Sequence, residues 1–172
     1  MINCPDCGHA NIPGADLCEQ CQQSLVDKPR PSSAVERALL EDSIRKLNPK
    51  RPLTVAPDTP IGEVLGILVR NSIGCVLVVE DDQVLGIFSE RDVLLRLNVD
   101  AADLSDRPVS DFMTPSPETL QTGDTIAFAI HRMDVGGFRH IPILAEGRAV
   151  GIISIRDILD YMTARISDAQ PA

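Results

Sequence analysis

Four cysteines near the N-terminus have the type and spacing of a metal site. Cys4 and Cys7, and then Cys18 and Cys21, form two C-x₂-C pairs that are separated by ten residues. Four thiolates can surround Zn²⁺ as a closed tetrahedron, which is a structural site because no position is left for a substrate. So short a segment, with few apolar side chains, would take its folding free energy from the metal. The sequence therefore predicts a structural zinc ribbon in residues 1–25.

A disulfide framework is the alternative for these cysteines, and it would need an oxidising compartment. The N-terminus shows no signal-peptide pattern, and the flanking residues lack the βαβ context of a redox C-x-x-C motif. We therefore expect a cytoplasmic protein with reduced cysteines. His9 lies beside the first pair, and we expect its side chain to be exposed rather than to act as a further ligand.

A second group of polar residues occurs twice, as Gly-x-x-Ser-x-x-Asp at Gly86–Asp92 and again at Gly151–Asp157. In each copy the glycine follows an apolar strand pattern, and the serine occupies the N-cap position of a predicted helix. A helix start offers free backbone N–H groups to an anion, and the aspartate one turn later can accept hydrogen bonds from hydroxyl groups. The pattern suits a ribose next to a phosphate. A capped helix with a solvated aspartate is the alternative, and two copies in one register favour the binding site.

These motifs belong to an internal repeat. A shift of 65 residues aligns Gly86 with Gly151 and Thr54 with Thr119 without a gap, and a fixed period of this kind indicates two copies of one structural unit. In the first copy we expect a helix over residues 58–71, a strand over 76–79, a turn over 80–83, a returning strand over 84–88 and a helix from residue 90.

The repeat resembles a pair of CBS domains, the Bateman module. The resemblance rests on both Gly-x-x-Ser-x-x-Asp motifs, on Thr-Val-x-Pro-Asp at Thr54–Asp58 and on Val-x-Asp-Phe-Met-Thr at Val109–Thr114. It implies an α+β fold in which two β-α-β-β-α repeats form a pseudo-two-fold disc. It also implies that adenosine-containing nucleotides, most simply AMP, ADP or ATP, bind in the clefts between the two sheets.

The resemblance also names the residues expected at the two clefts. They are Thr54, Val55, Gly74, Cys75, Val76, Gly86, Ser89, Arg91, Asp92, Thr119, Arg139, His140, Ile141, Pro142, Gly151, Ser154, Arg156 and Asp157. The second copy has Arg139 and His140 where the first has Gly74 and Cys75, and a guanidinium pairs well with phosphate oxygens. A surface ion pair and an ordinary strand histidine are the alternative. The asymmetry predicts that the clefts are not equivalent and favours the one with Asp157 and Arg139.

The segments between these motifs complete the predicted organisation. We expect a zinc ribbon at 1–25, a linker and helix at 26–47, the first CBS repeat at 48–98, an inter-repeat linker at 99–112, the second CBS repeat at 113–166 and a tail at 167–172. The N-terminal helix should begin after Ser32 or Ser33 and run to about Leu47, with Glu41 and Arg45 as an i,i+4 pair. We expect Cys75 to be a small buried hydrophobe rather than a reactive thiol, and His131 to be a surface residue.

Composition narrows the classes of function. The formal charge of −9, from 16 basic and 25 acidic residues, opposes non-specific binding to nucleic acid or to an anionic membrane. No apolar run approaches the roughly 18 residues of a membrane span. Aromatic residues make up 3% and tryptophan is absent, so the core must be aliphatic.

Taken together, the sequence predicts a regulatory module rather than an enzyme, since no nucleophile with an adjacent base and no open metal site can be recognised. From the resemblance we expect adenine-nucleotide binding, a role in energy sensing, a homodimer formed through the CBS repeats and an effector protein that reads the occupancy. A scaffold or dimerisation protein with empty clefts is the alternative. A zinc-ribbon nucleic-acid binder is disfavoured by the acidic charge.

Overall fold

The structure is a computed structural model that describes residues 1–25 and 33–168. Most of the predicted linker, including Ser32, and the end of the predicted tail lie outside these ranges. The chain divides into two compact units, which are described separately. The first comprises Met1–Asn48, Gln121–Arg139 and Ile153–Ala172, and the second comprises Pro49–Leu120 and His140–Ile152.

The first unit begins with a small two-stranded sheet, in which β1 (Ile2–Asn3) pairs antiparallel with β2 (Ala10–Asn11). Turns make up most of the remaining described part of this segment, up to Leu25. The four cysteines lie in or next to these turns, outside the two strands.

A helix follows the undescribed linker, and it is shorter than predicted. Ser33 caps α1 (Ala34–Glu41) by accepting the Glu36 N–H at 3.0 Å, and the α-helix ends at Asp42. A separate 3₁₀ turn, η1 (Ile44–Leu47), comes next. The predicted single helix to Leu47 is therefore wrong, because Asp42 has extended backbone and its carbonyl accepts the N–H of Ile126 at 3.0 Å.

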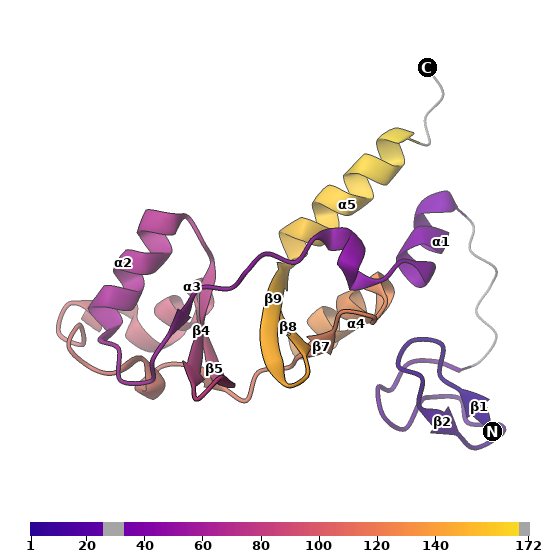
Figure 1. Ribbon diagram of the computed structural model, residues 1–172, viewed down its shortest axis with the longest axis horizontal. Helices are drawn as coiled ribbons and strands as arrows, with labels where there is room; N and C mark the ends of the chain where they lie inside the picture. The colour runs from indigo at the N-terminus through magenta and orange to yellow at the C-terminus, as the bar shows by residue number, and fades with distance from the viewer. Residues whose placement is uncertain (26–32, 169–172) are drawn as a thin grey trace. The chain divides into compact units, whose positions relative to one another are not determined.

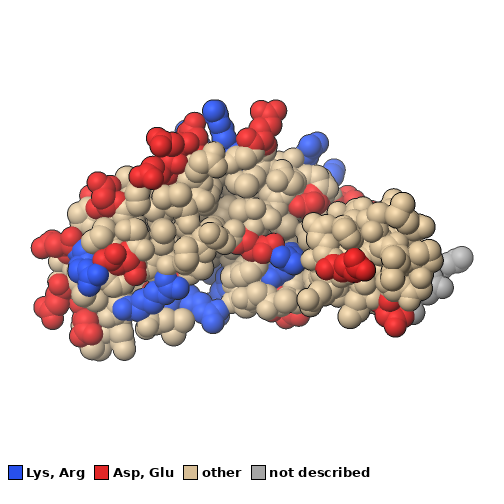
Figure 2. Space-filling view, turned by 90° about the horizontal axis from the view of Figure 1, so that it is seen from below, with Lys and Arg blue, Asp and Glu red and all other residues tan. Residues whose placement is uncertain are grey.

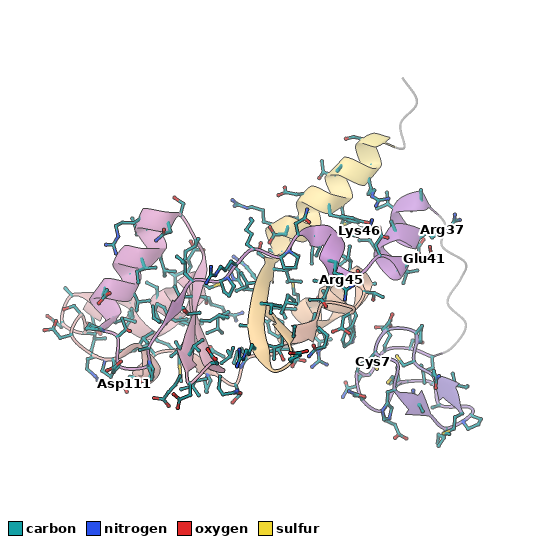
Figure 3. The ribbon with its side chains drawn as sticks, in the orientation of Figure 1. Cys7, Arg37, Glu41, Arg45, Lys46 and Asp111 are labelled. Carbon is teal, nitrogen blue, oxygen red and sulfur yellow. The ribbon has the colours of Figure 1, made fainter. Side chains whose placement is uncertain are left out.

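This break also separates Glu41 from Arg45. The two residues lie on α1 and on η1 respectively (Figure 3), and the Arg45 guanidinium donates to Thr122 Oγ1 at 3.3 Å. The predicted i,i+4 relationship along one helix is therefore wrong. The N-terminal helix instead packs across the second repeat, since α1 contacts both α4 (Ile126–Gly136) and α5 (Ile155–Asp168) (Figure 1).

The first repeat forms most of the second unit. Its elements are β3 (Thr54–Val55), α2 (Ile61–Asn71), β4 (Cys75–Glu80), β5 (Gln83–Ser89), α3 (Glu90–Asp92), a π-helical turn η2 (Val93–Leu97) and a 3₁₀ turn η3 (Asn98–Ala101). After η4 (Val109–Asp111), β6 (Thr114–Pro115) completes a sheet of order β3-β4-β5-β6. The hairpin turn at Asp81 and Asp82 has positive φ at both residues, as a type I′ turn requires.

Both faces of strand β4 are buried, which explains why its sequence is apolar without interruption. Val76 and Val78 face a core that includes Phe88 and the buried side of α2. Cys75 and Leu77 point to the other face, where Ile152 packs against them. Since a strand directs successive side chains to opposite faces, burial on both faces needs an unbroken apolar sequence, as predicted.

Two helices of the first repeat differ from their predicted bounds or type. Helix α2 starts at Ile61 rather than at residue 58, and its first free N–H groups donate to the carbonyls of Arg107 and Ser105 at 2.8 and 2.9 Å. The helix predicted after Ser89 becomes π-helical from Val93. Residues of the predicted inter-repeat linker thus cap a helix, and its Val109 is fully buried in the core.

The second repeat has the same order of elements. Strands β7 (Leu120–Gln121), β8 (His140–Ala145) and β9 (Arg148–Ser154) form one sheet of order β7-β8-β9, together with helices α4 and α5. Helix α4 is followed by Gly137 in the left-handed conformation, which favours glycine. The predicted α+β fold with two β-α-β-β-α repeats is confirmed. Within the described residues, no helix combines the length and apolarity needed to cross a membrane.

Candidate functional site

The four N-terminal cysteines converge on one point. Their Sγ atoms all lie within 4.8 Å of one another, and the pairs Cys4–Cys21 and Cys7–Cys18 are each 3.6 Å apart. A disulfide would require about 2.05 Å, whereas sulfurs arranged tetrahedrally at about 2.3 Å from a zinc ion lie about 3.8 Å apart. The donor set and its spacing fit a four-thiolate metal site.

Two matching knuckles present these sulfurs. In the first, the N–H of Gly8 donates to the carbonyl of Cys4 at 2.9 Å; in the second, the N–H of Gln22 donates to that of Cys18 at 2.8 Å. Gly8 and Gln22 both have positive φ, at 73° and 59°. Glycine adopts this left-handed conformation readily, whereas glutamine gives no sequence signal for it.

A buried asparagine joins the two knuckles. Asn11 is 1% exposed; its amide donates to the carbonyl of His9 at 2.8 Å and its side-chain oxygen accepts the N–H of Glu19 at 2.9 Å. Burial raises the pKa of Cys18, but hydrogen bonds from the Cys21 and Gln20 backbones outweigh it and lower this pKa to about 6. Burial raises the pKa of Cys7 and of Cys21 instead, so a metal would have to displace the protons of these thiols.

In the first repeat, the motif aspartate is enclosed. Asp92 is 6% exposed, and its Oδ2 accepts the backbone N–H of Ser89 at 2.9 Å and the Ser89 hydroxyl at 2.7 Å. Its Oδ1 accepts the hydroxyl of Thr114 at 3.0 Å and lies 3.5 Å from Nε of Arg96. The predicted serine cap is confirmed, and the carboxylate is saturated by protein groups.

Arg96 fastens this turn to the segment that leads into the second repeat. Its guanidinium donates to the carbonyl of Phe112 at 2.7 Å, to that of Met113 and to the Thr114 hydroxyl at 3.2 Å. Sequence reasoning missed this role of Arg96. The only available signal was its position four residues after Asp92, which allows an i,i+4 ion pair.

The second repeat forms the same serine–aspartate turn, but other residues surround it. Asp157 Oδ2 accepts the backbone N–H of Ser154 at 2.7 Å and its hydroxyl at 2.6 Å. The Asp157 side chain is half-buried, and the turn opens the 14-residue helix α5. At the position of Arg96, the second repeat has Tyr161.

Tyr161 makes a different connection. Its hydroxyl donates to Oδ2 of Asp42, which also accepts from Arg165 at 2.9 Å. Burial and the hydrogen bond to Asp42 raise the pKa of Tyr161 to about 12. This cluster ties α5 to the end of α1. It could not be predicted from the sequence, because the partners are more than a hundred residues apart.

The motif glycines allow close approach of the chain. A Cβ on Gly86 would lie 2.3 Å from Sδ of Met113, and one on Gly151 would lie 2.6 Å from Cβ of Pro49. At Gly74 a Cβ would meet the imidazole of His140 at 2.8 Å. In this structure, protein atoms therefore occupy the space that each glycine leaves.

The remaining predicted ligand residues divide between the two units. Arg139, Ser154, Arg156 and Asp157 belong to the first unit, and the other predicted ligand residues belong to the second. Val76 and Ile141 are core residues, whereas the side chains of Arg91, Arg139 and Arg156 are exposed. Thr54 and Val55 form β3, Pro142 is buried in β8, and Thr119 directly precedes β7.

Cys75, His9 and His131 are all at least partly buried. Cys75 is buried, as predicted, and burial together with the nearby charges of Glu90 and Asp92 raises its pKa to about 12. His9 is half-buried rather than exposed. His131 is also half-buried, and its Nε2 lies 3.0 Å from the carbonyl oxygen of Cys21, so the surface prediction for His131 is wrong.

Comparison with known proteins identifies the repeat. The family model described as "CBS domain" matches residues 44–98 and 109–164. A solved CBS-domain containing protein from Agrobacterium tumefaciens is 35% identical, covers 70% of this chain and 98% of its own, and superposes with a TM-score of 0.65. The CBS domain protein of Pyrobaculum aerophilum, solved in complex with AMP, is 24% identical over 74% of this chain and all of its own, with a TM-score of 0.63.

A curated relative is much longer than this chain. A CBS domain-containing protein from Arabidopsis thaliana is 26% identical over 166 residues, which is 93% of this chain and 31% of the relative. The chain thus spans about a third of that protein, and the match concerns the repeat module rather than the whole.

The surface charge bears on the choice of ligand. Acidic side chains are spread over much of the face shown in Figure 2, while basic ones form fewer groups. Together with the net charge of −9, this favours a small ligand held by local groups over a nucleic acid, which needs a basic surface.

Proposed function

The chain belongs to the CBS domain family, and from this premise we propose that it is a regulatory module that senses an adenosine nucleotide through its second repeat. AMP, ADP or ATP is the proposed ligand class, and a non-catalytic energy-sensing role is the proposed activity. The Pyrobaculum aerophilum relative in complex with AMP supports this choice. CBS-domain proteins are generally regulatory rather than catalytic.

One observation carries the proposal: the two motif aspartates differ in their surroundings. Asp92 is enclosed by Ser89, Thr114 and Arg96, so a ribose hydroxyl would have to displace a protein donor. Asp157 is half-buried at the start of a regular 14-residue helix, whose aligned dipole favours an anion at its N-terminus. The second repeat is therefore the better ligand site.

The proposed roles follow from the chemistry of each group. The carboxylate of Asp157 would accept hydrogen bonds from the ribose, and the N-terminal end of α5 at Ser154 would face the phosphate. Arg139 and Arg156 have exposed side chains, which leaves their guanidinium groups available to phosphate oxygens. The main chain of Arg139 is already fixed, because its carbonyl accepts the N–H of Ile155 at 2.9 Å.

We also propose that Cys4, Cys7, Cys18 and Cys21 hold a structural Zn²⁺. The metal would supply the folding free energy that so small a segment cannot obtain from a hydrophobic core. A reducing compartment such as the cytoplasm would keep these thiols available to the metal.

The first repeat is proposed to serve assembly into a homodimer. Its α2 and η2 expose Val69, Leu94 and Leu95 by 78%, 73% and 70%, which is unusual for residues of this type. They border a groove of about 760 Å³ lined by Leu65, Leu68, Val69, Ser72, Ile73, Glu90, Val93 and Leu94. A monomeric mass by light scattering at micromolar concentration would rule the homodimer out. In this proposal, a separate effector protein binds the homodimer and responds to its nucleotide occupancy.

Thermal melting with a panel of ligands tests the nucleotide site. AMP, ADP, ATP, S-adenosylmethionine and cyclic di-AMP are each added to the wild type, to Asp157→Ala and to Asp92→Ala. A ligand at a hundredfold its dissociation constant adds about 2.7 kcal/mol to the native state, which is a shift of several degrees for a chain of this size. We expect AMP or a related nucleotide to shift the wild type and Asp92→Ala but not Asp157→Ala.

Each variant is compared with its own ligand-free melt, since Asp92→Ala will start from a lower midpoint. A shift that disappears only in Asp92→Ala would move the site to the first repeat. No shift of the wild type with any ligand at millimolar concentration would overturn the nucleotide proposal and favour the scaffold alternative.

A further inference from the structure

The N-terminal cysteine segment makes a direct hydrogen bond to the second repeat, and both partners lie in the first unit. Nε2 of His131, in the middle of α4, lies 3.0 Å from the carbonyl oxygen of Cys21. Because a carbonyl can only accept, the imidazole N–H must be the donor. The acceptor is the main chain of a cysteine of the metal-binding cluster, so its position depends on the second knuckle being formed.

A groove lies around this hydrogen bond. Residues of both the cysteine segment and α4 line it. It has a volume of about 670 Å³ and is bordered by the cysteine segment, α1, α4 and the start of α5. Its lining residues are Asp6, Gln23, Leu40, Ala127, Ile130, His131, Met133, Asp134, Gly137, Phe138, Arg139 and Ile155. Asp6 is only 7% exposed, so this side of the segment is covered.

The contact is specific to the second repeat. The 65-residue shift places Gly66 of α2 at the position of His131, and glycine has no side chain to donate a hydrogen bond. The same shift matches Leu65 of the open groove beside α2 with Ile130 of the groove beside α4. The groove beside α4 is thus lined partly by the cysteine segment, through Asp6 and Gln23, whereas the groove beside α2 is lined by the first repeat alone.

Helix α4 leads directly to the proposed ligand site. It ends at Gly137, and two residues later the carbonyl of Arg139 accepts the N–H of Ile155 at the start of α5. Arg139 and Ile155 also line the groove. A short covalent and hydrogen-bonded path therefore joins the cysteine segment, α4 and the turn that carries Asp157.

We propose that the metal-loaded cysteine segment is a clamp on α4, held by His131, and that it stabilises the ligand-binding turn of the second repeat. This inference rests on the zinc and nucleotide sites proposed above. Without metal, the second knuckle loses the source of its folding free energy, the Cys21 carbonyl is no longer held in place, and α4 loses its partner. Because such coupling is reciprocal, bound nucleotide should also tighten the binding of zinc.

Hydrogen–deuterium exchange of the full chain, with and without a zinc chelator, tests the clamp. Metal analysis first establishes that the purified chain holds one zinc per molecule. We expect removal of zinc to speed exchange of the amides of residues 126–136 about fivefold, as expected for the loss of a net hydrogen bond. Residues 61–71 of α2 form the matched internal control, and their exchange should not change.

Variants of His131 separate the clamp from general destabilisation. His131→Leu should speed exchange in α4 and weaken nucleotide binding about fivefold while zinc content stays unchanged. His131→Gln retains a side-chain N–H donor, so it should restore both properties, and His9→Ala serves as a control in the cysteine segment itself.

The outcomes keep the two levels of inference apart. If zinc is bound but neither its removal nor His131→Leu alters exchange in α4, the clamp is wrong and the zinc site stands. If the purified chain holds no zinc, the metal site fails and the metal-dependent clamp fails with it. If exchange in α4 responds while no nucleotide binds, the link to the ligand site is wrong and the proposed function falls separately.

Discussion

The two repeats share one seven-residue motif and use it differently. In both, the serine N–H and hydroxyl bind the aspartate three residues later, with distances between 2.6 and 2.9 Å. In the first repeat, Thr114 and Arg96 occupy the other carboxylate oxygen of the aspartate. In the second, the residue at the position of Arg96 is Tyr161, which turns to Asp42 instead.

The helices that follow the motif also differ between the two repeats, in their type and in their length. The first repeat continues as three α-helical residues, a π-helical turn and a 3₁₀ turn. The second repeat continues as α5, 14 residues of α-helix. The N-terminus of a helix favours an anion, and α5 is the helix that we propose for the phosphate.

The difference teaches that a shared motif fixes a local fold but not a function. Each turn is completed by a segment far away in the sequence: Phe112–Thr114 reach the first repeat through Arg96, whereas Asp42 reaches the second through Tyr161. In the first repeat, Thr114 and Arg96 close off the motif aspartate, and the second repeat is the one that we propose for the ligand.

Replacing each aspartate by alanine should expose this difference most strongly. Asp92→Ala removes an enclosed acceptor and leaves Ser89, Thr114 and Arg96 without their partner, which should cost about 3 kcal/mol. Asp157→Ala removes a helix cap and should cost about 1 kcal/mol. Denaturant unfolding of both variants measures the two free energies, and equal losses would contradict the structural assignment of Asp92.

Much of the fold could be predicted from the sequence because it repeats. The 65-residue shift located both strand–turn–helix units, and the continuous apolar run of residues 76–79 predicted a strand buried on both faces. The C-x₂-C spacing likewise placed four sulfurs on one point without any tertiary information. These features depend on local sequence, where turn residues, caps and periodicity act directly.

The rest depends on contacts that no local pattern encodes. The helix ending at Asp42 is broken because its main chain binds Ile126, and the predicted linker is structured because Val109 is needed in the core. Similarly, His131 looked like a surface residue on its own helix, and its partner, Cys21, lies 110 residues away. Tertiary partners decide such positions, and one sequence does not name them.

The motif glycines offer a second comparison of the repeats. Neither Gly86 nor Gly151 has a positive φ, so an alanine is limited by space alone. At Gly151 the new Cβ would meet the rigid ring of Pro49 at 2.6 Å, whereas at Gly86 it would meet the flexible side chain of Met113 at 2.3 Å. Overpacking typically costs 1–3 kcal/mol, so we expect about 2 kcal/mol for Gly151→Ala and about 1 kcal/mol for Gly86→Ala.

Thermal melts of the two glycine variants check this order. The wild type and a double variant serve as references, because the two sites lie in the same unit and the sum of the single losses should hold if they act independently. A larger loss at Gly86 would mean that Met113 is held rigidly, and the close approach would then be tighter in the first repeat.

The smallest expected effect concerns how the contacts of Tyr161 in the second repeat and of Arg96 in the first repeat depend on pH. The pKa of Tyr161 is raised to about 12, so its neutral, hydrogen-bonded form stabilises the fold below pH 10, the unperturbed pKa of tyrosine. This stabilisation is lost as the pH rises from about 10 to about 12. The free energy of unfolding of the wild type should therefore exceed that of Tyr161→Phe by about 1 kcal/mol at pH 8, and the difference should shrink at pH 11. Arg96→Leu is the control, because a guanidinium stays charged over this range and its difference from the wild type should remain constant. A Tyr161→Phe difference that is equally constant would show that the hydroxyl of Tyr161 does not close the second repeat.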